Sequence, residues 1–138
     1  MIKRYHGTST NSANSIVGPP ANINLTLGGG ELGVGFYVGQ SVSLCAGRAK
    51  SKYGTNTCLI EFKISPSNYY SLRILRIHNR DYVRRLWIRL NRTSNRNTYL
   101  FNYDIVRAPY AVIYYSLQEK FESLNAKNIL ETSRIRII

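Results

Sequence analysis

The sequence predicts an α+β fold, a mixture of short strands and short helices around one core. Apolar and polar residues alternate in several short runs, most clearly over 58–64, and such runs are typical of strands. The run 81–90 instead has apolar residues at positions i, i+3, i+4 and i+7, the spacing of an amphipathic helix. With 138 residues, 43% of them hydrophobic, the chain can bury a core, and we expect a single domain over 1–138.

The first half of the chain is predicted to place a strand, a helix and a glycine-rich loop before its second strand. We expect a strand over 2–6 and a helix over 9–17, because Ser9, Thr10 or Asn11 can cap the first turn. The run 18–20, Gly-Pro-Pro, then ends this helix. The elements predicted after it are a loop over 21–35, a strand over 35–38, a helix over 42–53 and a strand over 58–64.

The second half is predicted to be richer in strands. The apolar face of the helix over 81–90 leaves Arg84, Arg85 and Arg89 on its other faces. The strands predicted in this half cover 70–77, 103–106, 111–115, 118–124 and 133–137.

Positive charge dominates the composition, with 19 Lys and Arg against 7 Asp and Glu and a formal net charge of +12. Such a field concentrates polyanions, so nucleic acid, acidic proteins and anionic membranes are candidate partners. Eight arginines lie between residues 73 and 96, with aromatic residues interleaved among them. Because guanidinium groups bind phosphate and rings stack on bases, we expect a nucleic-acid-binding surface. Its candidate residues are Arg80, Arg84, Arg85, Arg89 and Arg92. A solvated basic face, or a docking surface for an acidic protein, is the alternative interpretation.

Several other classes of protein are not supported. No apolar run reaches the roughly 18 residues needed to cross a bilayer, and the polar start is unlike a signal peptide, so we expect no membrane insertion. Cys45 and Cys58 have no metal-ligand spacing with His6 or His78, so we expect no metal site. We interpret both cysteines as buried thiols, with one disulfide as the alternative. The glycines over 28–33 lack the strand–turn–helix context of a dinucleotide-binding fingerprint.

Two short motifs carry the most specific functional information, Tyr-His-Gly-Thr-Ser at 5–9 and Gly-Val-Gly-Phe-Tyr at 33–37. Alone, His6 is compatible with a structural histidine, and Tyr37 with a core tyrosine. In this order, each followed by a helix, the motifs resemble the nicotinamide pocket of the ADP-ribosyltransferase superfamily, in its diphtheria-toxin and poly(ADP-ribose) polymerase (His-Tyr-Glu) branch. At the level of pattern, most of residues 4–125 also resembles small bacterial ADP-ribosyltransferase toxin domains.

The resemblance implies a fold in which two antiparallel sheets with flanking short helices form a cleft for NAD⁺. It also implies residue roles. His6 would hydrogen-bond a ribose, Gly7 would hold the nicotinamide carboxamide through its backbone, and Thr8 would add a ribose contact. Tyr37 would stack on nicotinamide. The family places a serine at the position of Cys45. Ser43, two residues earlier, would make the contact of that serine with the carboxamide.

The chemistry of this family requires a carboxylate as well. Breaking the bond between nicotinamide and ribose creates an oxocarbenium-like sugar, whose positive charge a carboxylate can stabilise. The family places this glutamate at the start of a late strand, and Glu119 resembles it. Glu122 remains an alternative, because the spacing from Glu119 to Asn125 and Ile129 is about one residue longer than is usual in the family. The two glutamates would face opposite sides of a regular strand. Asp104 is a further candidate, for which we favour a structural hydrogen bond.

Together, these observations predict a mono-ADP-ribosyltransferase with His6, Tyr37 and Glu119 as catalytic residues and RNA, rather than DNA, as the acceptor. The resemblance further implies a monomeric bacterial effector toxin that acts in the cytoplasm of a target cell and is blocked by an acidic immunity protein. Delivery would use a secretion system or a larger secreted protein. The alternatives are an NAD⁺ glycohydrolase, transfer to a protein, and a catalytically inactive nucleic-acid-binding module.

Overall fold

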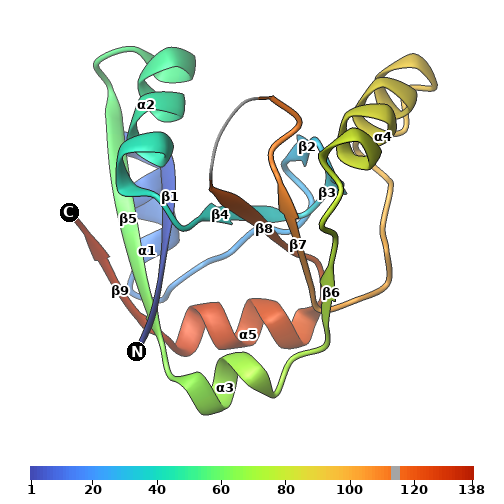
Figure 1. Ribbon diagram of the computed structural model, residues 1–138. Helices are drawn as coiled ribbons and strands as arrows, with labels where there is room; N and C mark the ends of the chain where they lie inside the picture. The colour runs from blue at the N-terminus through green and yellow to red at the C-terminus, as the bar shows by residue number, and fades with distance from the viewer. Residues whose placement is uncertain (113–115) are drawn as a thin grey trace.

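The computed structural model describes residues 1–112 and 116–138, which form one twisted, seven-stranded mixed sheet and a two-stranded ribbon (Figure 1). The order in the sheet is β6-β7-β8-β4-β1-β5-β9; β6 pairs parallel with β7, and the other pairs are antiparallel. Its strands are β1 (Ile2–Ser9), β4 (Phe36–Gly39), β5 (Thr57–Ile64), β6 (Ile74–Arg76), β7 (Ile105–Pro109), β8 (Leu117–Phe121) and β9 (Arg134–Ile137). The ribbon pairs β2 (Gly29–Gly30) with β3 (Gly33–Val34).

The α+β class is therefore confirmed, whereas the expectation of two separate antiparallel sheets is wrong. β1 and β4 join the two groups of strands into one sheet, but they do so at a single residue pair, Tyr5 opposite Gly39. By contrast, β1 pairs with β5 along its whole length, from Ile2 to Ser9. The sheet thus has two halves, β1-β5-β9 and β4-β8-β7-β6, with a narrow junction between them.

Five helices in the described ranges surround this sheet: α1 (Thr10–Val17), α2 (Val42–Tyr53), α3 (Pro66–Tyr70), α4 (Arg80–Arg92) and α5 (Leu124–Thr132). A Ser or Asn side chain caps the start of each by accepting a backbone N–H from the first turn, as Ser9 does for α1. In Figure 1, α2 lies at one end of β1 and β5, α3 and α5 lie at the other end, and α4 stands beside the β2–β3 ribbon.

Two hydrophobic clusters fill opposite faces of the sheet. The larger one joins α1, α3 and α5 to β4, β5 and β8, with Phe62, Phe121 and Tyr69 fully buried. The smaller one joins α4 to β7 and to Leu32 of the ribbon. Neighbouring β7 residues show the alternation directly, since Ile105 belongs to the larger cluster and Val106 to the smaller.

Several predicted elements differ from the observed ones at their ends. The strand predicted over 118–124 ends at Phe121, because Ser123 caps α5, a helix that the sequence pattern did not indicate. The strand predicted over 70–77 is only Ile74–Arg76, since Tyr70 ends α3. For the strand predicted over 111–115, residues 111 and 112 lie in a bend, and 113–115 lie outside the described residues. In the described part of the chain, no helix combines the length and the apolar character needed to cross a membrane.

Candidate functional site

A cleft of about 710 Å³ opens where the two halves of the sheet separate. Its walls are residues 5–8 of β1, residues 35–39 at β4, the loop and ribbon residues 27–31, and one side of α2. This volume lies within the range of pockets that hold cofactor-sized ligands. Both sequence motifs therefore contribute to one concave site.

His6 and Tyr37 meet at the junction of the sheet halves. The His6 Nδ1 lies 2.6 Å from the backbone oxygen of Tyr37, and because a carbonyl only accepts, Nδ1 carries the proton and donates. The imidazole also stacks on Phe36, with ring centroids 4.2 Å apart. Burial lowers the pKa of His6 to about 4, and the nearby Lys52 charge adds to this effect. The ring is therefore neutral at pH 7, with Nε2 as its acceptor nitrogen.

Tyr37 is fixed in the cleft through its hydroxyl. The hydroxyl donates to the backbone oxygen of Gly33 at 2.5 Å and accepts the N–H of Leu32 at 3.0 Å. The ring packs directly on Gly30, where a Cβ would lie 2.5 Å from the ring carbon that bears the hydroxyl. Burial raises the pKa of Tyr37, so the side chain is an uncharged phenol with a fixed ring.

The other residues that the resemblance indicated fall into two groups. Gly7 and Thr8 line the cleft. Gly7 also lets β1 approach α2, since a Cβ there would lie 2.7 Å from the Ala49 Cβ. Ser43 is exposed in the first turn of α2, 3.2 Å from the Ser41 hydroxyl, and is not among the residues that line the cleft.

Glu119 does not line the cleft, contrary to the expected geometry. In β8, Gln118 pairs with Gly39 of β4 and Glu119 pairs with Val38, so the two side chains face opposite sides of the sheet. Gln118 is the one that lines the cleft, while Glu119 is fully buried on the other side. The predicted catalytic carboxylate therefore follows a cleft residue in sequence but faces the opposite side of the sheet.

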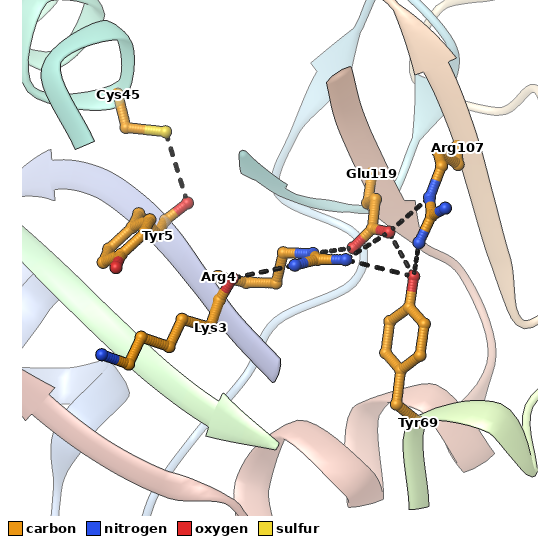
Figure 2. A network of polar contacts seen from close by, with 7 residues as sticks. All are labelled: Lys3, Arg4, Tyr5, Cys45, Tyr69, Arg107 and Glu119. Atoms are coloured by element: carbon orange, nitrogen blue, oxygen red, sulfur yellow. Dashed lines mark hydrogen bonds and ion pairs between the residues drawn. The ribbon is translucent and has the colours of Figure 1, made fainter. Parts of the chain in front are cut away.

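The Glu119 carboxylate is instead the centre of a buried polar cluster, shown in Figure 2. Arg4 donates to it at 2.6 and 3.2 Å, and Arg107 donates at 3.0 Å. The Tyr69 hydroxyl also donates to Glu119 and accepts from Arg107 at 2.5 Å. Burial alone would raise the pKa of Glu119, but the hydrogen bonds and the Arg4 charge more than offset it and hold the pKa below its ordinary value. The carboxylate is thus held in its ionised form at neutral pH and ties β1 to β7, β8 and α3.

Glu122, the alternative carboxylate, also lies outside the cleft lining. It forms an ion pair with the buried Lys120 at 2.5 Å. It also accepts the backbone N–H groups of Phe101 and Asn102 at 2.9 and 3.0 Å. Glu122 thus holds the segment before β7, which is a structural role.

Asp104 has a similar structural role. Its carboxylate accepts the backbone N–H of Arg73 at 2.7 Å and the Ser123 hydroxyl at 2.5 Å. These contacts agree with the hydrogen-bonding role that the sequence favoured.

The cleft contains functional groups that the sequence analysis missed. Glu31 lies in it, and its Oε1 accepts the Gln118 side-chain N–H and the Ala111 backbone N–H, both at 2.8 Å. Arg48 and Lys52 of α2 supply two cations along the same cleft. The strict alternation of a strand was the signal that distinguishes Gln118 from Glu119. No local pattern indicated Glu31, because its hydrogen-bond partners come from the segment after β7 and from β8.

The five candidate arginines for nucleic-acid binding lie on α4. Val83, Leu86 and Leu90 bury one face of this helix. Arg84, Arg85, Arg89 and Arg92 are exposed, and Arg80 is half-buried. Arg84 also donates to Asp81 at 3.1 Å. Because Leu32 packs in the same cluster as α4, the arginine helix adjoins the ribbon that carries Glu31.

Cys45 and Cys58 are free thiols; Cys45 is buried and Cys58 is half-buried. Across residues 1–112 and 116–138, no group of three or more His, Cys, Asp or Glu has the arrangement of a metal site.

The sequence was also compared with known proteins. No family model matches it, and no curated protein shows a significant match. Functional inference for this chain therefore depends on its motifs and on the geometry of the cleft.

Proposed function

We propose that the cleft binds NAD⁺ and that the protein is a mono-ADP-ribosyltransferase, with RNA as its acceptor. The observation that carries this proposal is the contact between His6 and Tyr37 across the sheet junction, which joins both motifs in one cleft of about 710 Å³. A cleft of this size suits a dinucleotide, and its polar groups are distributed along its length.

The lining residues suggest how NAD⁺ would be held. The neutral His6 can accept a ribose hydroxyl through Nε2, since Nδ1 is occupied by the Tyr37 carbonyl. The fixed Tyr37 ring offers an aromatic surface for the cationic nicotinamide. Arg48 and Lys52, on the α2 side, can neutralise the pyrophosphate.

The proposed reaction breaks the bond between C1′ of the ribose and the nicotinamide nitrogen. The electron pair of that bond leaves with nicotinamide, and positive charge develops on C1′ and the ring oxygen. A nucleophile of the acceptor then attacks C1′, forms the new glycosidic bond and gives its proton to water. Binding in the cleft would orient the two reacting groups.

The exposed arginines of α4 support RNA as the acceptor. Arg85, Arg89 and Arg92 are exposed on the same helix as the half-buried Trp87, and the ribbon that packs with this helix lines the cleft. Phosphates bind guanidinium groups, and single-stranded bases stack on aromatic rings. The bacterial toxin context and the acidic immunity protein stay predictions.

The test is to incubate the purified protein with adenylate-labelled NAD⁺ and with separate RNA, DNA and protein pools, and to measure both nicotinamide release and transferred label. We expect release of nicotinamide and label on RNA. Tyr37→Ala should raise the KM for NAD⁺ at least tenfold. Tyr70→Ala, an exposed tyrosine outside the cleft, is the matched control and should leave the KM unchanged.

The outcomes separate the alternatives. Nicotinamide release without label on any pool would identify an NAD⁺ glycohydrolase, and label on protein alone would overturn the RNA acceptor. Absence of both NAD⁺ binding and nicotinamide release would overturn the proposed activity and leave a nucleic-acid-binding module.

A further inference from the structure

We infer that Glu31, on the ribbon loop and not on the late strand β8, is the carboxylate that stabilises the reacting ribose. This inference rests on the proposed function, because it assigns a catalytic residue to that reaction. It follows from which acidic side chains reach the cleft and from how the protein holds them.

Among the described residues that line the cleft, Glu31 is the one Asp or Glu. Glu119 and Glu122 lie outside this lining, and each is paired with cations inside the fold, Glu119 with the buried Arg4 and the half-buried Arg107, and Glu122 with the buried Lys120. No lysine or arginine in the described chain forms an ion pair with Glu31, so its negative charge is available to a ligand.

Two hydrogen bonds fix the orientation of the Glu31 carboxylate. The backbone N–H of Ala111 and the Nε2 of Gln118 both donate to Oε1 of Glu31, each at 2.8 Å. Gln118 is itself fixed, because it also donates to the Pro109 carbonyl at 3.2 Å and is buried in β8. Within the described residues, no hydrogen bond reaches the second oxygen, Oε2. The carboxylate is therefore held by one oxygen while the other can accept a hydrogen bond from a sugar hydroxyl.

Glu31 also lies beside the aromatic ring of the cleft. Gly30, the residue before Glu31, packs on the Tyr37 ring, and the Tyr37 hydroxyl accepts the backbone N–H of Leu32, the residue after Glu31. Tyr37 is the ring on which nicotinamide is proposed to stack. A carboxylate beside that ring lies near the ribose attached to nicotinamide, where the positive charge forms.

In the proposed step, Glu31 acts by its charge and not as a nucleophile. When the C1′–nitrogen bond breaks, its electron pair leaves with neutral nicotinamide, and the ribose becomes cationic. The Glu31 carboxylate accepts a hydrogen bond from a ribose hydroxyl and stabilises this charge without forming a bond to C1′. The acceptor oxygen or nitrogen then bonds to C1′, and its proton passes to water. Glu31 leaves the reaction unchanged.

Glu31→Gln tests the inference, because it removes the charge and keeps an oxygen that can accept from Ala111 and Gln118. We expect the kcat of nicotinamide release to fall at least about 100-fold with the KM for NAD⁺ within about threefold. Asp81→Asn, which changes an exposed carboxylate on α4, is the control and should keep both constants. Circular dichroism and thermal unfolding report whether each variant is folded.

Gln118→Met is the second variant, and it decides the question if Glu31→Gln does not fold. It removes one of the two donors that orient Glu31, and we expect about a tenfold loss in kcat with little change in KM. If the wild type releases nicotinamide and the folded Glu31 or Gln118 variant keeps its kcat within threefold, the assignment of Glu31 is wrong while the proposed function stands. If the wild type neither binds NAD⁺ nor releases nicotinamide, both proposals fail.

Discussion

At the scale of single residues, neighbouring side chains of one strand have opposite roles. Gln118 reaches the cleft and orients Glu31, while Glu119 is buried among Arg4, Arg107 and Tyr69. A carboxylate with several cationic or hydroxyl donors has few free lone pairs for a substrate. Glu119 therefore contributes to stability, and its charge is paired with Arg4 and Arg107 inside the fold.

Replacing Glu119 by Gln should for this reason destabilise the protein. The change leaves the buried Arg4 and the half-buried Arg107 without their counter-charge, and we expect the free energy of unfolding to fall by about 3–5 kcal/mol. Urea unfolding followed by circular dichroism measures it. Asp81→Asn, which breaks an exposed ion pair with Arg84, should cost at most about 1 kcal/mol. A stable Glu119→Gln protein that lost nicotinamide release would restore Glu119 as the catalytic residue.

His6 should make stability depend on pH below neutrality. Its pKa is about 4 in the folded state and about 6.5 in the unfolded chain, so the unfolded state binds more protons between these values. The free energy of unfolding should therefore decrease as pH falls from about 6.5 to 4, by at most about 1.4 kcal/mol per pH unit. The measurement is urea unfolding at several pH values for the wild type and for His6→Asn. Equal slopes for the two proteins would contradict the buried, neutral His6.

At the scale of elements, the contact between β1 and α2 decides where the cleft lies. α2 packs on β1 and β5, and it carries Arg48 and Lys52 to the cleft. Gly7 allows this approach because the helix backbone at Cys45 occupies the space that a side chain would need. The glycine of the first motif is thus required by packing, independently of any ligand.

Gly7→Ala should consequently lower stability by about 1–3 kcal/mol, because its Cβ would overlap the Cys45 carbonyl and the Ala49 side chain. Gly47→Ala is the matched control on α2, since a Cβ there meets no atom within 4 Å. That change should instead stabilise the protein by roughly 0.5–1 kcal/mol, because Ala has the higher helix propensity. Thermal unfolding distinguishes the two, and an unchanged midpoint for Gly7→Ala would show that α2 can move away from β1.

At the scale of the whole molecule, the net charge of +12 is unevenly distributed. Part of it is buried, as in Arg4 and Lys120, and serves the fold. Another part is exposed on α4, which packs beside the ribbon of the cleft. This arrangement allows one face to bind a polyanion while the cleft remains open to a smaller substrate.

RNA binding should therefore depend steeply on salt, and α4 should carry much of that dependence. Each phosphate contact on a single strand contributes about 0.7 to the slope of log K against log salt. Replacing Arg84, Arg85 and Arg89 together by Gln should reduce this slope by about 2, as measured by fluorescence anisotropy with a labelled RNA. The control replaces the exposed Lys3, Lys50 and Arg134 by Gln and should reduce it by less than 1. Equal reductions in both triple variants would show non-specific attraction instead of a surface on α4.

Much of the secondary structure could be predicted from the sequence. The strand over 58–64 and the helices over 9–17, 42–53 and 81–90 lie within one or two residues of β5, α1, α2 and α4. These elements have strong local signals, a capping side chain at one end or a clear apolar period. α5 was missed because the run 118–124 alternates like a strand, and the Ser123 cap divides it into the end of β8 and the start of a helix.

The sequence predicted part of the candidate site, and there is a physical reason why it did not predict the rest. The sequence by itself determined the α+β class, the charge on α4 and the two motifs at His6 and Tyr37, because each depends on neighbouring residues and their period. Only the tertiary structure decided that the halves of the sheet join at Tyr5 and Gly39 and that Glu31 meets Gln118 in the cleft. It also decided that Glu119 is buried. These facts depend on strand register, and a shift of one residue moves a side chain to the other face of the sheet.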